Sequence, residues 1–324
     1  MSPSPEAERH QRERARLAAA AARAAGEAWR RVDTADVRGT WAAQLPGVLG
    51  QVAAAQLTAA RQAEPYLHVV LGEEGEEGRA ASDRLVPGSL AGVAPDGRPL
   101  LDLLMYPVWS TLAAVRRGLS LAVAWASGAA LVDLLVRTVV ADTGRAADLV
   151  GMIVRPAVTG YVRVVELPAC ARCIILAGAY GLRTAFERHP RCDCTMEPVT
   201  AGHRPTSIDA NDVYDRMTDA QRTRAFGRAG VQAIDAGADF AQVVNARRGM
   251  TTATAYGRRL QTTTEGVTRR GIAGNRLRNF APAPAAGRRV TASRTPRLMP
   301  EEIYRIADDR EHAVRLLRRY GYIL

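Results

Sequence analysis

Four cysteines lie within one 25-residue window of a 324-residue chain, and there is no cysteine elsewhere. They form two pairs, Cys170-Ala-Arg-Cys173 and Cys192-Asp-Cys194, which 18 residues separate. Two pairs at such short spacing can place four thiolates around one ion, and zinc is the metal that favours this tetrahedral arrangement. A shared metal would tie two segments of the chain together, so this cluster constrains the fold more than any other feature.

A fifth candidate ligand, His189, lies three residues before Cys192. Because a Cys-x-Cys pair is tight for a single ion, the imidazole could replace one of its thiols. The spacing fits both a site of four thiolates and a site of three thiolates and one imidazole. Closed coordination of this kind is normally structural, since a catalytic zinc keeps one position for water.

The alternatives to a metal site are two disulfides or four thiols. A bridge between Cys192 and Cys194 would be strained, which leaves only long-range pairings. The first residues are charged and contain no apolar signal segment, which favours a cytosolic origin and disfavours disulfides.

The residues around the cysteines form a longer pattern. A Cys-x-x-Cys pair, a glycine-containing segment at 176–180 and Phe186 precede the run His189-Pro-Arg-Cys-Asp-Cys194. This pattern resembles the hallmark of phage minor head proteins of the Mu F-like family, a Cys-x-x-Cys followed by His-Pro-x-Cys-x-Cys. The family usually has Arg between the last two cysteines, whereas Asp193 stands here. That difference keeps the candidate ligands and removes one positive charge beside them.

The resemblance covers about residues 150–324 and is looser after the cysteines, in segments 237–250, 300–304 and 316–322. It implies a minor capsid (head morphogenesis) protein that acts near the portal during procapsid assembly. The implied partners are the portal protein, capsid or scaffold protein, and packaged DNA. The implied location is the virion, in the head interior or at the portal vertex, after assembly in the host cytoplasm. Similar proteins are also described as capsid maturation proteases, which cleave scaffold or capsid protein, and this is the alternative function.

Hydrophobic periodicity predicts a mainly α-helical chain. The expected parts are a helical domain at 1–155 with an acidic Gly/Glu linker at 72–99, a Cys-rich α/β knuckle at 156–205, a helical extension at 206–250, an extended basic arm at 251–299 and a C-terminal docking helix at 300–324. The longest uncharged apolar stretch, between Arg117 and Asp133, has 15 residues and is too short to cross a bilayer. A buried helix is therefore expected there, and no membrane contact.

Local signals predict several element boundaries. Ser4 and Pro5 should start the first helix, and Asp33-Thr34 should cap a second, short helix that ends at Trp41. A third helix is expected from Val48 to about Ala63. The apolar region from Leu100 to Val154 should form helices that break at Pro107, Gly118 and 142–144. Further predictions are a strand at Thr159–Leu167 and a capping box at Thr218-Asp-Ala-Gln221.

Positive charge is concentrated in one segment. The formal net charge is +11, and every basic residue other than the five histidines is Arg. Residues 251–299 hold ten arginines and one acid, Glu265. Such a segment could follow a phosphate backbone or an acidic protein surface without reading bases, or it could be a solvated linker whose Arg content reflects codon bias. The candidate contacts are Arg258, Arg259, Arg269, Arg270, Arg276, Arg278, Arg288 and Arg289.

The sequence identifies no catalytic residue. Asp142-Thr-Gly144 matches the aspartic-protease tripeptide, but it occurs once and follows apolar residues with a helical pattern, whereas the catalytic motif needs a strand and a loop. No Gly-x-Ser-x-Gly, His-Glu-x-x-His or P-loop motif is present, and no helix-turn-helix signal supports a DNA-binding regulator. An assembly component is the better interpretation than an enzyme.

Overall fold

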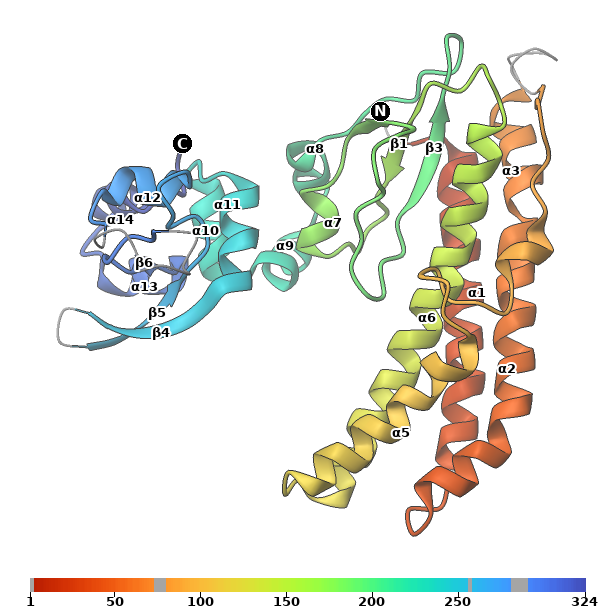
Figure 1. The fold of residues 1–324 in the computed structure, drawn as a ribbon. Coiled ribbons are helices and arrows are strands. Elements are labelled where there is room, and N and C mark those ends of the chain that lie inside the picture. Colours follow the sequence, from red (N-terminus) through yellow and green to blue (C-terminus); the bar gives the residue numbers. More distant parts are fainter. Residues whose placement is uncertain (1–2, 73–79, 256–257, 281–290) are drawn as a thin grey trace. The chain divides into compact units, whose positions relative to one another are not determined.

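The computed structural model describes residues 3–72, 80–255, 258–280 and 291–324. Within these ranges the protein is mainly helical, as predicted, and carries two three-stranded antiparallel sheets. The chain forms two compact units (Figure 1). The first comprises Met1–Glu166 with Leu176–Ile208, and the second comprises Leu167–Ile175 with Asp209–Leu324.

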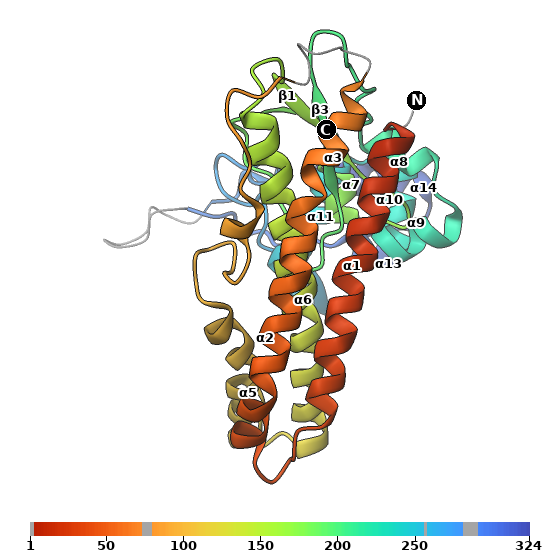
Figure 2. The same cartoon turned by 90° about the vertical axis from the view of Figure 1, so that its right-hand side faces the viewer.

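The first unit is built on a bundle of long helices. Its helices are α1 (Pro5–Arg30), α2 (Val37–Arg61), α3 (Ala63–Val70), the 3-10 turn η2 (Pro87–Leu90), α5 (Leu100–Arg116) and α6 (Leu121–Ile153). Helices α1, α2 and α6 run side by side and pack against one another (Figure 2). Trp29 belongs to their core and is fully buried, with the centre of its ring 5.1 Å from that of Trp41 and 4.8 Å from that of Trp125.

The start of α1 agrees with the prediction, because the Ser4 hydroxyl accepts a hydrogen bond from the Ala7 amide at 3.1 Å. The start of α2 does not. Asp36 is its cap, and the helix continues through Pro46 where two shorter helices were predicted. The buried residues Trp41, Leu45, Val48 and Val52 form one stripe across the proline, and this packing outweighs the backbone hydrogen bond that the proline removes.

Two of the three breaks predicted between Leu100 and Val154 are absent. Gly118, at a φ of 88°, does separate α5 from α6, but Pro107 lies buried inside α5 and residues 142–144 lie inside α6. The Thr143 hydroxyl donates to the Val139 carbonyl at 2.8 Å, a hydrogen bond that a continuous helix permits. Tertiary packing along α6 therefore overrides the turn signal of Asp142-Thr-Gly144.

Helix α6, with 33 residues, is long and apolar enough to cross a membrane by length and composition. The same test is passed by core helices of proteins that are not in membranes, and α6 packs against α1, α2, α3 and α5. A third of its most apolar window is buried within the described residues, less than expected for a wholly buried helix.

A small sheet covers one end of the bundle in the first unit. Its strands are β1 (Gly160–Val164), β2 (Ala179–Gly181) and β3 (Thr195–Val199), in the order β2-β1-β3. β1 confirms the strand predicted before the cysteines, and all five of its residues are buried. Tyr161 pairs with Tyr180 on one side and Pro198 on the other, and it shares a core with Leu67 and Met152 of the helices.

The second unit combines short helices with the other sheet. Its helices are α7 (Ala171–Ile174), α8 (Ala210–Asp215), α9 (Asp219–Phe226), α10 (Arg228–Asp235), α11 (Phe240–Ala246), η3 (Arg247–Gly249), α12 (Ile272–Leu277), α13 (Pro300–Ile306) and α14 (Arg310–Arg319), and its strands are β4 (Met250–Ala255), β5 (Arg258–Thr263) and β6 (Arg297–Leu298). The predicted capping box is present, since Thr218 accepts from the Gln221 amide at 3.3 Å and the Gln221 side chain accepts from Thr218 at 2.9 Å.

Segment 251–299 has more regular structure than its composition predicts. Its first part is a β4–β5 hairpin that extends from the unit (Figure 1), and α12 and β6 follow. Threonine is β-branched and recurs in both strands, which favours extended structure, and the high Arg content hid this signal. Arg297 is buried in β6 and donates to the carbonyls of Tyr320 and Glu265. The prediction of an extended arm over 251–299 is therefore wrong for this part of the segment, which belongs to the core of the second unit.

The C-terminal segment forms two helices where one was predicted. α13 ends at Ile306, and Asp309 caps α14 by accepting from the His312 amide at 2.7 Å. Ile303 of α13 and Leu317 of α14 are fully buried. α13 packs against α10 and β5 of its own unit, which identifies a surface on which the segment docks.

Candidate metal centre

The five predicted metal ligands come together. The sulfurs of Cys170 and Cys173 and a ring nitrogen of His189 all lie within 4.8 Å of one another. The sulfurs of Cys173, Cys192 and Cys194 also lie within 4.8 Å of one another, so Cys173 belongs to both groups. Cys173, Cys192 and Cys194 are buried and Cys170 is exposed. This set of side chains could bind a metal ion.

Local structure orients the first cysteine pair. Cys170 is the N-cap of α7, and its sulfur accepts a hydrogen bond from the Cys173 amide at 3.4 Å. An amide that donates to a sulfur stabilises the thiolate, which is the form that binds metals. The Cys-x-x-Cys spacing thus places one ligand at the start of a helical turn and the next ligand within it.

The other three candidate ligands lie between β2 and β3. The Nδ1 atom of His189 is 2.7 Å from the Pro190 carbonyl oxygen. Because a carbonyl oxygen only accepts, Nδ1 carries the proton and Nε2 keeps the lone pair that a metal needs. Cys194 directly precedes Thr195, the first residue of β3, so the sheet fixes its backbone.

A buried arginine of β1 contacts the second cysteine pair. Arg163 donates from Nη2 to the Cys192 sulfur at 3.4 Å and from Nη1 to the Glu187 carbonyl at 2.8 Å. Its guanidinium lies 4.2 Å from the centre of the Phe186 ring. Positive charge beside a sulfur favours the thiolate, so Arg163 suits a metal-binding cysteine. The sequence did not single out Arg163, because only the folded sheet brings it to Cys192.

A second buried arginine joins this segment to the helical bundle. Arg145 of α6 donates to the carbonyls of Cys192 at 2.9 Å and Cys194 at 3.1 Å, and it forms an ion pair with Asp142. Asp142 also accepts from Arg188 at 2.7 Å. The carboxylate of the protease-like tripeptide is therefore inside a helix and bound to two guanidinium groups. This environment is that of a structural ion pair and differs from the strand-and-loop setting of a catalytic aspartate.

The candidate nucleic-acid contacts do not form one extended arm. Arg258 and Arg259 are exposed on the β4–β5 hairpin, and Arg269 and Arg270 are exposed before α12. Arg276 and Arg278 are exposed as well, and each donates to a main-chain carbonyl, Arg276 to that of Arg318 at 2.7 Å and Arg278 to that of Asn275 at 3.2 Å. Arg288 and Arg289 lie outside the described residues.

Comparison with models of protein families, with curated proteins and with solved structures finds no match to this chain.

Proposed function

We propose that the chain is a phage minor capsid (head morphogenesis) protein in which the Cys/His cluster binds one structural zinc ion. The observation that carries the proposal is the convergence of Cys170, Cys173, His189, Cys192 and Cys194 within short ligand-to-ligand distances. The same five side chains carry the sequence likeness to Mu F-like minor head proteins. A single feature thus supports both the metal and the family.

Zinc is proposed because the ligand set is rich in sulfur. Three or four thiolates, with or without one imidazole, suit a four-coordinate zinc. A closed set of protein ligands leaves no position for water, so the ion would cross-link the chain and not activate a substrate. The buried Arg145 and Arg163 hold the Cys192–Cys194 segment in place through its carbonyls and one sulfur, as groups around a metal site commonly do.

The assembly role is proposed from the family likeness together with the exposed arginines of the second unit. A portal, capsid or scaffold protein with an acidic surface, or packaged DNA, would face the four exposed arginines of the hairpin and of the turn before α12. The protein would then reside in the virion, in the head interior or at the portal vertex.

A co-assembly experiment tests this function. The chain is produced together with the portal, scaffold and capsid proteins of the same genome, and procapsids are isolated and analysed for its presence. The proposal predicts that the wild-type protein is incorporated and that Cys173→Ser, which removes the ligand common to both groups, abolishes incorporation. An exposed serine changed in parallel, Ser127→Cys, is the control and should leave incorporation unchanged.

The same preparation tests the protease alternative. Scaffold and capsid proteins that stay intact in the presence of the chain agree with an assembly role. Cleavage that disappears on a single substitution such as Asp142→Asn, in a protein that still folds, would contradict the proposal.

A further inference from the structure

The β4–β5 hairpin leaves a long strand edge of the second unit open. In the sheet order β4-β5-β6, strand β4 has a neighbour on one side only. The hairpin projects from its unit (Figure 1), and Thr251, Thr252 and Thr254 are exposed. Other edge strands in the described parts of the chain are shorter or covered: β2 has three residues, β6 has two, and β3 is mostly buried against α1, α3 and α6. An open edge is a template for pairing with another strand.

The residue opposite Thr252 does not bond to it. Thr252 lies opposite Gln261 of β5. The Gln261 carbonyl accepts from the Met299 amide at 3.0 Å, and the Gln261 amide donates to the Glu302 carboxylate at 3.1 Å. Both main-chain groups of Gln261 are therefore used on the side of β5 that faces away from β4.

The same alternation extends along β4. Opposite residues of antiparallel strands alternate between pairs that exchange two hydrogen bonds and pairs that exchange none. The Thr264 amide donates to the Gly249 carbonyl at 3.0 Å, so this pair is of the first kind. Counting along the register from Gly249, Thr252 and Thr254 belong to pairs of the second kind. Their N–H and C=O groups point to the open edge, and no main-chain partner meets them within the described residues.

Strand β4 has none of the features that usually protect a strand edge. Charged side chains, proline and bulges commonly prevent edges from pairing. The strand reads Met250-Thr-Thr-Ala-Thr-Ala255, without charge or proline, and its six residues pair with β5 in unbroken register. The β-branched threonines favour extended structure. The edge is therefore both unprotected and straight enough to accept another strand.

Positive charge beside the edge indicates which kind of strand fits. Arg259 lies opposite Thr254, so the two side chains leave the same face of the sheet. Arg258 and Arg259 are both exposed, and residues 240–264 contain no acid. A second copy of this chain would bring only another uncharged strand with the same arginines beside it. Acidic side chains on the added strand would instead be attracted.

Duplex DNA fits the arginines but not the edge. Phosphate oxygens accept hydrogen bonds and donate none, so the carbonyls of Thr252 and Thr254 would gain no donor from a phosphate backbone. An extended polypeptide supplies donors and acceptors in the same alternation as β4.

We propose that the open edge of β4 binds an extended acidic segment of a partner protein, which adds a strand to the β4-β5-β6 sheet. The added strand would exchange hydrogen bonds with the main chain of Thr252 and Thr254. Neighbouring strands lie about 4.8 Å apart, so an acidic residue opposite Thr254 would have its backbone about 10 Å from that of Arg259, within the combined reach of the two side chains. None of these residues belongs to the metal centre, and this docking edge is independent of the proposed function.

Amide hydrogen exchange and NMR titration of the full-length protein test the proposal. In the free protein, the amides of Thr251 and Ala253 should be protected by β5, and those of Thr252 and Thr254 should exchange rapidly. The probe is the capped peptide Val-Thr-Glu-Thr-Glu-Thr-Val, for which we expect a Kd of about 1 mM or below. Saturating peptide should protect the amides of Thr252 and Thr254, and Lys in place of both Glu should weaken binding about tenfold. No saturable binding, or binding without this protection, would overturn the proposal.

Substitutions at Thr252 separate main-chain pairing from side-chain contact. Thr252→Pro removes an N–H that β5 does not use, so the hairpin should remain folded while the peptide binds about tenfold more weakly. Thr252→Val keeps the N–H and should bind like the wild type. A folded proline variant with wild-type affinity would contradict the proposal.

N-methylated peptides test the pairing without changing the protein, in case the proline disturbs the hairpin. Two versions of the acidic peptide carry methyl groups on alternate amides, one on each edge of the strand. One version should bind and the other should not, because only one row of amides faces β4. Equal effects of the two patterns would contradict strand addition.

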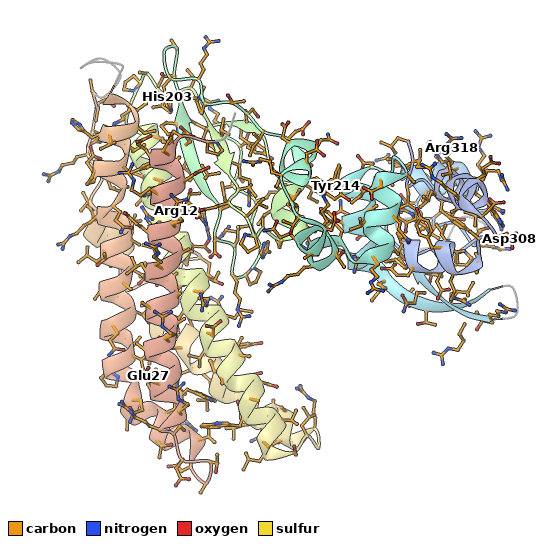
Figure 3. All side chains as sticks on the ribbon, turned by 180° about the vertical axis from the view of Figure 1, so that it is seen from behind. Arg12, Glu27, His203, Tyr214, Asp308 and Arg318 are labelled. Carbon is orange, nitrogen blue, oxygen red and sulfur yellow. The ribbon has the colours of Figure 1, made fainter. Side chains whose placement is uncertain are left out.

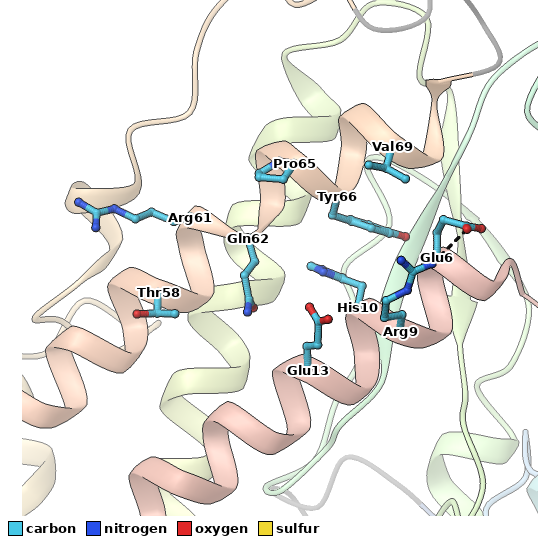
Figure 4. Close-up of a pocket in the computed structure, with 10 residues that line it drawn as sticks. All are labelled: Glu6, Arg9, His10, Glu13, Thr58, Arg61, Gln62, Pro65, Tyr66 and Val69. Carbon is cyan, nitrogen blue, oxygen red and sulfur yellow. Dashed lines mark hydrogen bonds and ion pairs between the residues drawn. The ribbon is translucent and has the colours of Figure 1, made fainter.

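Charge substitutions test the acidic character of the partner. Arg259→Gln should weaken the acidic peptide about threefold. Two exposed arginines provide controls with the same loss of charge: Arg318→Gln on α14 of the same unit (Figure 3) and Arg61→Gln on α2, beside the cavity between α1 and α2 in the first unit (Figure 4). Neither control should change binding. An Arg259 variant that behaves like the controls would contradict an acidic partner.

The other two occupants of the edge give different results in the same measurements. Protection of the Thr252 and Thr254 amides that rises with protein concentration, without peptide, would indicate a second copy of this chain. Protection of these amides by a random DNA duplex but not by the acidic peptide would assign the edge to nucleic acid. Either result would overturn the proposal.

Discussion

Arg163 donates a hydrogen bond from Nη2 to the sulfur of Cys192 at 3.4 Å, and both side chains are buried. A guanidinium at this distance stabilises a thiolate relative to a thiol. The relationship links the strand before the cluster to one of its ligands, so the affinity of the cluster for a metal should depend on a residue that cannot itself bind one.

Replacing Arg163 with Met should weaken zinc binding about tenfold, because partners of metal ligands typically contribute this much or more. Competition with a chromophoric chelator measures the change. Arg183→Met, at an exposed position between β2 and β3, is the matched control and should leave the affinity unaltered. An Arg163 variant with wild-type zinc affinity would show that the hydrogen bond does not tune the site.

Gly144 should be intolerant of a side chain. A Cβ at this position of α6 would overlap Nη1 of Arg14, which forms a buried ion pair with Asp148 at 2.9 Å. We expect Gly144→Ala to lower the free energy of unfolding by about 3 kcal/mol, through overpacking and the disturbed ion pair. Gly26→Ala in α1, where nothing lies within 4 Å of the added carbon, should instead raise stability by up to about 1 kcal/mol. Urea unfolding of the two variants measures the contrast, and equal effects would refute the close approach of Arg14.

The Asp148 network should make stability depend on pH in the acid range. Burial alone would raise the pKa of Asp148, but Arg14 and His10 outweigh burial and hold the pKa below its ordinary value of 3.8. The folded protein therefore releases this proton more readily than the unfolded chain. The stabilisation is complete above the ordinary pKa and is lost as the pH falls through the lower folded value.

Asp148→Asn tests this dependence. At neutral pH it should cost about 3 kcal/mol, because it leaves the charge of Arg14 buried without its partner. The difference in unfolding free energy between wild type and variant should shrink as the pH falls below 3.8. A difference that stays constant down to the acid transition would mean that Asp148 is not ionised in the folded protein.

The exposed arginines of the β4–β5 hairpin should contribute to any binding of DNA. If Arg258 and Arg259 contact phosphates, the double change to Gln should reduce the slope of log affinity against log salt by about 2. Fluorescence anisotropy with a random duplex at several salt concentrations measures the slope. Arg23 and Arg38, exposed in the first unit, provide a double control with equal loss of charge. If the two double variants have equal slopes, the hairpin arginines affect DNA binding only through the net charge of the protein.

The local features of this chain could be predicted from its sequence, and the long-range contacts could not. The caps at Ser4 and Thr218 and the strand β1 depend on neighbouring residues and are where they were expected. The convergence of the five ligands was also predictable, because close spacing limits where two cysteine pairs can go.

The positions that the sequence misjudged share a physical cause. Pro46, Pro107 and Asp142-Thr-Gly144 carry turn signals, yet each lies within a helix whose buried stripe continues past it. The sequence did not single out Arg145, Arg163 or Arg297, and each of them is buried with main-chain carbonyls as acceptors. A chain whose basic residues are all arginine gives no compositional clue to which of them are internal.

Zinc-edge X-ray absorption on the purified protein, combined with elemental analysis, tests the proposed metal centre most directly. A closed structural site predicts about one zinc per chain, with four protein ligands, three or four of them sulfur at about 2.3 Å and any nitrogen at about 2.0 Å. His189→Gln would leave an all-sulfur shell unchanged and would disturb a mixed one. A fully folded protein without metal, or a zinc with a water ligand in its shell, would contradict a closed structural zinc site.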